Sequence, residues 1–141
     1  MKTILRNEVL AILFGLSACS WVPHWACHYY RLETESTFVV GNWSFSSTDS
    51  IASLLVYGSL IVLNLVSISV SKLRVSASLI TGLCHVIIGS IHLYRLWNPF
   101  TFEVFGYTWS YGASVREVVI VVPFGLLCLF VASKLHHQKA L

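Results

Sequence analysis

Residues 75–94 read VSASLITGLCHVIIGSIHLY, twenty consecutive residues without Asp, Glu, Lys or Arg. A helix that crosses a hydrocarbon core of about 30 Å needs about 20 predominantly apolar residues. The stretch therefore predicts a membrane-spanning helix. It also contains His85 and His92, which are seven positions apart and so lie about two turns apart on one side of that helix. An account of the protein has to explain why an apolar helix carries them.

The composition of the whole chain agrees with a membrane protein. Of 141 residues, 56% are hydrophobic and 11% are charged, whereas a soluble domain carries about 25% charged residues. Uncharged windows of spanning length predict four helices, and Pro123 should bend the last of them. We expect an all-α integral membrane protein, a four-helix bundle in one domain of residues 1–141. The predicted helices are 9–25, 51–71, 75–94 and 118–133, with longer loops at 26–50 and 95–117.

Cations gather at one end of these predicted helices. Cytoplasmic flanks of membrane helices are enriched in Lys and Arg. Both termini and the short link between the second and third helices should therefore face the cytoplasm, and the two longer loops should face outside or into a lumen. The cations in question are Lys2, Arg6, Lys72, Arg74, Lys134 and Lys139.

All five tryptophans fall at or beyond the predicted outer ends of helices. Indole rings prefer the headgroup layer, where the ring is half-buried and its N–H is wet. This distribution predicts a structured outer face. The five are Trp21, Trp25, Trp43, Trp97 and Trp109.

Two short stretches resemble processing signals. Leu16-Ser17-Ala18-Cys19 fits a bacterial lipoprotein cleavage box, although we expect the segment to be retained as the first helix. Asn42-Trp43-Ser44 is an N-glycosylation acceptor in the first outer loop. In a eukaryotic secretory membrane Asn42 would be a glycosylation site, and in a bacterium the triplet would mean nothing.

Histidine and cysteine side chains offer candidate metal or haem ligands. His24 and His28 are four positions apart, so on a helix they share one face, with Cys27 beside them. The alternative is that these histidines are interfacial amphipathic residues. His28 on the first helix and His92 on the third could also ligate a haem near the outer face. We expect no metal and no cofactor, and we keep both ligand sets as alternatives.

His85 should lie near the middle of the membrane, where a polar side chain generally faces the bundle interior and finds a polar partner. Asn64 on the second helix lies at a comparable height. The sequence therefore predicts a helix–helix polar contact between Asn64 and His85. Ser78 and Gly82 form a small-xxx-small pair, which permits close helix approach.

The predicted helix cores contain no Asp, Glu, Lys or Arg. Proton-coupled transporters and intramembrane hydrolases need ionisable residues at depth, and the sequence has no phosphate-binding loop, C-x-x-C pair or nucleic-acid surface. We therefore expect a non-enzymatic protein with no nucleic-acid partner. Two alternatives stay open: a haem- or metal-binding redox protein using His24, His28, His85 and His92, and a small oligomeric transporter.

The layout of the loops resembles the tetraspan group of claudins, peripheral myelin protein and AMPA-receptor regulatory (TARP) proteins. Residues 71–96, SKLRVSASLITGLCHVIIGSIHLYRL, are similar to the basic link and third helix of peripheral myelin protein. Residues 105–112, FGYTWSYG, resemble the aromatic entry to the fourth helix of this group. The first loop departs from the W-GLW-C-C signature of claudins, because VVGNWSFSSTD has Trp43 but neither cysteine.

This resemblance implies an accessory or assembly subunit of a channel, receptor or junction. Its outer loops and helix faces would contact a larger membrane protein or a second copy, in the plasma membrane or alternatively an endomembrane. It also implies a β-structured extracellular cap, and TFVVGNWSFS has the β-branched and aromatic content of strands. Large aromatics are frequent interface anchors. The predicted contact residues are Trp43, Trp97, Trp109 and Tyr111.

Overall fold

The computed structural model describes residues 6–105 and 107–139, without the side chain of Lys139. Lys2, one of the cations used to predict orientation, lies outside this range. The described residues form four helices that are long and apolar enough to cross a membrane, which confirms the predicted four-helix bundle. They are α1 (Asn7–Thr34), α2 (Ser47–Ser69), α3 (Arg74–Trp97) and α4 (Tyr111–Lys139), with a 3-10 turn η1 (Ser71–Leu73) between α2 and α3.

Two helices extend well beyond the predicted windows. α1 continues past Pro23 and ends only where Glu35 takes a left-handed backbone (φ 53°), and α4 begins at Tyr111 rather than at residue 118. A window that stops at the first charge measures contact with lipid, whereas helical hydrogen bonding continues through charged turns. The connections are correspondingly short, 35–46 and 98–110, so the predicted loops 26–50 and 95–117 are too long.

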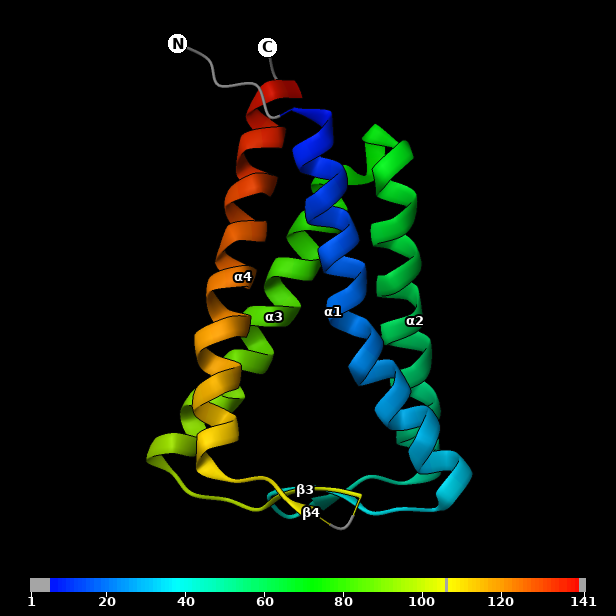
Figure 1. The fold of residues 1–141 in the computed structure, drawn as a ribbon, viewed down its shortest axis with the longest axis vertical. Coiled ribbons are helices and arrows are strands. Elements are labelled where there is room, and N and C mark those ends of the chain that lie inside the picture. Colours follow the sequence, from blue (N-terminus) through cyan, green and yellow to red (C-terminus); the bar gives the residue numbers. More distant parts are fainter. Residues whose placement is uncertain (1–5, 106, 140–141) are drawn as a thin grey trace.

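A small antiparallel sheet lies at the end of the bundle opposite the termini (Figure 1). Its central strands come from different connections, and Val39 pairs with Glu103 at the midpoint. The described part of the chain has its four cysteines free, so the sheet is held by hydrogen bonds and packing. The strands are β1 (Phe38–Val40), β2 (Trp43–Ser44), β3 (Phe102–Val104) and β4 (Tyr107–Thr108), in the order β2-β1-β3-β4.

The two halves of the molecule repeat one pattern with an offset of 64 residues. β3 and β4 begin 64 positions after β1 and β2. The Gly41 N–H donates to Thr101 O at 2.6 Å, and the counterpart bond runs from the Phe105 N–H to Thr37 O at 2.9 Å. Gly41 and Phe105 both have a left-handed backbone, with φ of 62° and 57°. An approximate twofold axis through the sheet therefore relates the halves.

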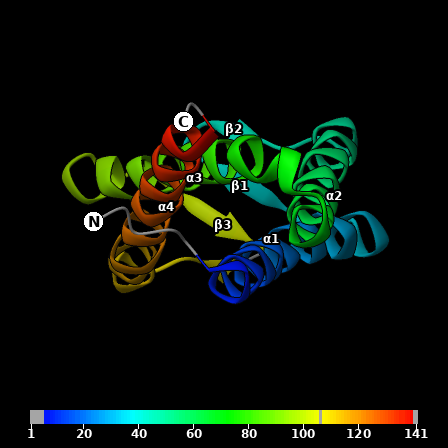
Figure 2. The ribbon, with the colours of Figure 1, turned by 90° about the horizontal axis from the view of Figure 1, so that it is seen from above.

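Each half is a helical hairpin, α1 with α2 and α3 with α4 (Figures 1 and 2). The hairpins converge at the end that carries the termini and diverge toward the sheet, which bridges them. The convergence is filled by an apolar cluster centred on α1 and α4. Its buried members are Leu10, Leu13, Phe14, Ala77, Cys128, Val131 and Leu135.

Polar contacts between the hairpins also follow the repeat. Asn64 Nδ2 donates to Thr81 Oγ1 at 2.9 Å, and the equivalent positions are Cys128 and Ser17, whose Sγ and Oγ lie 3.9 Å apart. The predicted contact between Asn64 and His85 is therefore wrong in its partner. Asn64 reaches one helical turn further, to Thr81, because His85 turns toward the carbonyl of its own helix.

His85 lies against Trp21, and this pairing answers why the apolar third helix carries a histidine at mid-depth. Its Nδ1 lies 2.8 Å from Thr81 O, and its ring centroid lies 4.1 Å from that of Trp21. Trp21 is fully buried, so it belongs to the core and not to the predicted aromatic belt. The belt assignment of Trp21 failed because α1 extends nine residues beyond residue 25, which places Trp21 well inside the helix.

Candidate functional site: a chamber beneath the sheet

His28, Arg31 and Ser50 tie the last turn of α1 to the start of α2, and we call them the first clamp. Arg31 Nη1 donates to Ser50 Oγ at 3.0 Å and to Ser46 O at 3.3 Å. Arg31 Nη2 donates to Phe45 O. His28 Nδ1 lies 3.3 Å from Ser50 Oγ. Backbone oxygens at the turn into α2 are thereby satisfied by a cation on α1.

His92, Arg95 and Ser114 repeat this arrangement between α3 and α4, and we call them the second clamp. Arg95 Nη1 donates to Ser114 Oγ at 2.7 Å and to Ser110 O at 3.4 Å. Arg95 Nη2 donates to Trp109 O at 2.6 Å. His92 Nδ1 lies 3.2 Å from Ser114 Oγ. Each partner lies 64 positions after its counterpart in the first clamp.

The charge of Arg95 is stabilised without a carboxylate among the described residues. Its side chain is only 3% exposed, and a buried cation needs hydrogen-bond acceptors. Three backbone oxygens and one hydroxyl accept from it, its guanidinium lies 5.1 Å from the Tyr111 ring centroid, and a cation in the last turn of a helix is favoured by the helix dipole. Arg95, predicted as a loop residue, is therefore a structural centre of α3.

The signal for both clamps was present in the sequence and was missed. His28-Tyr29-Tyr30-Arg31 and residues 92–95, HLYR, share the spacing H-x-x-R, and each is followed 19 residues after its arginine by a serine. A search for internal repeats would have found it.

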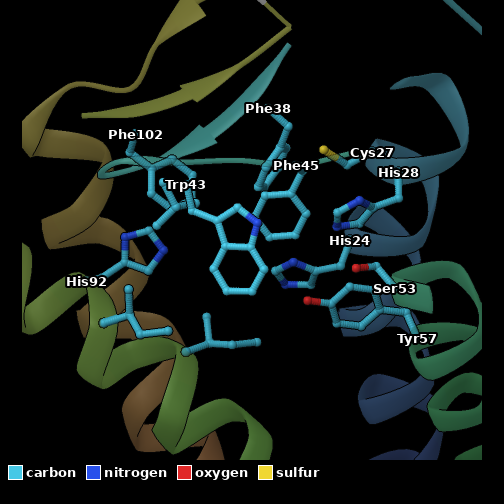
Figure 3. A pocket seen from close by; sticks show the side chains of 13 residues that line it. His24, Cys27, His28, Phe38, Trp43, Phe45, Ser53, Tyr57, His92 and Phe102 are labelled. Atoms are coloured by element: carbon cyan, nitrogen blue, oxygen red, sulfur yellow. The ribbon is translucent and has the colours of Figure 1, made fainter. Parts of the chain in front are cut away.

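A partly enclosed chamber of about 340 Å³ lies beneath the sheet, between the two hairpins (Figure 3). The clamps hold its roof, since His28 and His92 belong both to the clamps and to the chamber wall. The surface of the chamber is mostly apolar. It is lined by His24, Cys27, His28, Phe38, Val40, Trp43, Phe45, Ser53, Tyr57, Ile88, Ile91, His92 and Phe102.

The wall of the chamber is polar on one side and apolar on the other. His24 and Tyr57 lie on the side of α1 and α2 (Figure 3), with ring centroids 5.3 Å apart. The positions 64 residues later hold Ile88 and Val121. Cys27 likewise corresponds to Ile91. The repeat that builds a symmetric frame therefore carries different side chains where it faces the chamber.

The structure brings together three of the predicted ligand histidines, His24, His28 and His92, around the chamber. His85 lies deeper, against Trp21. Within residues 6–105 and 107–139, no group of three His, Cys, Asp or Glu side chains is placed to hold a metal ion. Haem ligation by His28 and His92 stays a prediction, because both rings face one cavity and each Nδ1 is already paired with a serine.

The four predicted partner-contact residues divide into different environments. Trp43 lines the chamber, and the Trp109 ring packs against Phe102 at 5.4 Å. Tyr111 is half-exposed beside Arg95. Trp97 is 72% exposed and makes no ring contact with a described residue. Trp97 thus fits a contact surface best.

Asn42 is exposed in the tight turn between β1 and β2. The turn projects from the sheet end of the molecule, and its glycosylation stays a prediction. A transferase would meet an exposed side chain there.

No protein-family model, curated protein or solved structure matches this chain. The class of protein is therefore defined by the fold alone: four helices of membrane-spanning length in two repeated hairpins, joined by a four-stranded sheet over a chamber.

Proposed function

We propose that this is a non-enzymatic membrane protein that binds a small apolar molecule in the chamber beneath the sheet. The observation that carries the proposal is a chamber of about 340 Å³ with a mostly apolar surface and a few convergent polar groups. Ligand sites of this kind have volumes of about 300–1,000 Å³ and the same mixed lining. The helical walls of the chamber belong to segments of membrane-spanning character, so lipid-soluble molecules would reach it from the bilayer.

The proposed orientation places both termini and η1 in the cytoplasm and the sheet outside or in a lumen. Arg74 supports a cationic inner end, since its Nη1 donates to Asn7 Oδ1 at 2.8 Å and its Nη2 to Ile68 O at 2.8 Å. Cytoplasmic helix flanks carry such cations. The plasma membrane or an endomembrane would supply the ligand from its outer leaflet.

Native mass spectrometry of the protein extracted from its own membrane tests the proposal. We expect an apolar adduct on the full chain, and we expect Ile88→Trp to remove it by filling the chamber wall. Ile87→Trp is the matched control, because Ile87 is 60% exposed on the outer surface of α3. An adduct that survives Ile88→Trp would refute the site, and an adduct with haem absorbance would establish the redox alternative instead.

An auxiliary-subunit role is a second candidate, favoured by the exposure of Trp97 beside a sheet fixed by both clamps. We propose that Trp97 contacts a larger membrane protein, as the likeness to claudins and receptor-regulatory tetraspans implies. A photo-crosslinking residue at position 97 should give one recurrent product in the native membrane. The same residue at Phe130, which is 56% exposed elsewhere on the bundle, should give none. Equal crosslinking at both positions would reject this role.

A further inference from the structure

We infer that the chamber selects an uncharged amphiphile with a single hydroxyl or carbonyl head, and that this head lies against α1 and α2. The inference rests on the proposed binding function and adds the chemical class and orientation of the ligand. Its basis is the difference between the two halves of the repeat at the chamber wall.

The frame of the two halves is matched bond for bond, so differences between them at the chamber are not forced by the fold. On the first side the chamber meets His24, Ser53 and Tyr57. The same positions in the second half are Ile88, Glu117 and Val121, and only Ile88 among these lines the chamber. One end of a ligand would therefore meet hydroxyls and an imidazole, and the other end would meet aliphatic carbon.

The polar side chains on the first side are available to a ligand. The described part of the chain offers no hydrogen bond to the Tyr57 hydroxyl, the Ser53 hydroxyl or the His24 ring nitrogens. His24 and Tyr57 are instead held as stacked rings, and both pack on Trp21 with centroids 5.8 Å away. Donors and acceptors fixed by packing and left without partners are suited to an incoming polar group, because burying them unpaired would cost about 1–3 kcal/mol each.

The charge of the lining sets the charge of the ligand. None of the side chains that line the chamber is Asp, Glu, Lys or Arg. A carboxylate, phosphate or ammonium head would be desolvated there without an opposite charge, which is strongly unfavourable. A neutral hydroxyl or carbonyl avoids this penalty and still pairs with Tyr57, Ser53 or His24. Prenyl alcohols combine such a head with a body that apolar walls accept.

Equilibrium binding of radiolabelled farnesol to the full chain in lipid nanodiscs tests the inference, with the saturated hydrocarbon farnesane as the comparison probe. We expect farnesol to bind at least about threefold to tenfold more tightly than farnesane, which is the contribution of a hydrogen bond. Farnesyl phosphate should compete at least tenfold more weakly than farnesol.

Tyr57→Phe keeps the stacked ring and removes only the hydroxyl, and Ser53→Ala removes the neighbouring one. The double variant should bind farnesol as weakly as farnesane and leave farnesane unchanged. Ile88→Val on the opposite wall is the matched control and should keep the preference. A thermal melt of each variant, compared with the native chain, verifies that the fold is intact.

The outcomes separate the two proposals. If neither farnesol nor farnesane binds saturably, the proposed binding function fails. If both bind equally, or if the double variant keeps the preference for farnesol, the binding function stands and the inferred polar end is wrong. Preferential binding of farnesyl phosphate would overturn the neutral-head assignment.

Discussion

At the scale of single residues, the protein places its few buried polar groups in pairs that satisfy one another. His28 and Arg31 share Ser50, and His92 and Arg95 share Ser114. Each serine hydroxyl is fully buried, so it cannot be replaced by water. The histidines that suggested metal or haem ligation in the sequence have a structural task that accounts for their position near the outer helix ends.

Ser114→Ala should destabilise the protein by about 1–3 kcal/mol, because it leaves buried donors on Arg95 and His92 without their partner. The free energy of unfolding in detergent measures this change. Ser90→Ala is the control, since Ser90 is exposed and bonds only to Val86 O in its own helix, and its effect should stay within about 0.5 kcal/mol. Equal effects of the two substitutions would contradict the clamp.

At the scale of secondary-structure elements, small residues set how closely the helices of a hairpin approach. Gly82 faces Gly125 across α3 and α4, where an added Cβ would lie 2.8 Å from the Gly125 oxygen. The predicted small-xxx-small pair, Ser78 and Gly82, is buried. In the other hairpin the contact between Trp25 and Gly58 corresponds to Gly89 and Val122, so the large and small partners have exchanged helices.

Gly89→Ala should destabilise the α3–α4 hairpin by about 1–3 kcal/mol, the usual effect of overpacking. The new Cβ would lie 2.3 Å from Val122 Cγ2. Adding Val122→Ala should recover most of the loss, because the opposite side chain then leaves room. Thermal unfolding of the single and double variants measures both effects. Gly15→Ala is the control, since an added Cβ there meets no atom within 4 Å, and it should leave stability unchanged or slightly raised.

At the scale of the whole molecule, two hairpins that could separate are locked at both ends. The sheet joins them through β1 and β3, and the apolar cluster of α1 and α4 joins them at the other end. The space between these two joints is the chamber. This closed frame favours a binding role over a transporter that rocks one repeat against the other, because rocking would break the β1–β3 pairing.

The termini and the α2–α3 link should lie on the opposite side of the membrane from the β1–β2 turn. A reporter that fluoresces only in the cytoplasm should be active when fused after Leu141 and inactive when inserted at Asn42. Fluorescence from the Asn42 insertion and none from the C-terminal fusion would reverse the orientation. Fluorescence from both would mean that the helices do not all span the membrane.

The sequence by itself determined the solvent and the number of helices. Uncharged runs of spanning length are a property of composition, and a hydrocarbon core leaves a helix as their stable form. Helix ends were misplaced because charges mark where lipid contact stops, and hydrogen bonding continues to Thr34 in α1 and starts at Tyr111 in α4. The repeat was readable as H-x-x-R spaced by 64 residues, once the structure showed what those residues do.

Only the tertiary structure decided which polar groups meet. Asn64 could pair with His85 or Thr81 on grounds of height, and the rotation of α3 about its axis, fixed by packing on Trp21, selected Thr81. The chamber likewise depends on two hairpins diverging beneath a shared sheet, a relation between residues far apart along the chain. Periodicity reports on one helix at a time, so the polar wall at His24 and Tyr57 and the apolar wall at Ile88 became visible only when the halves were assembled.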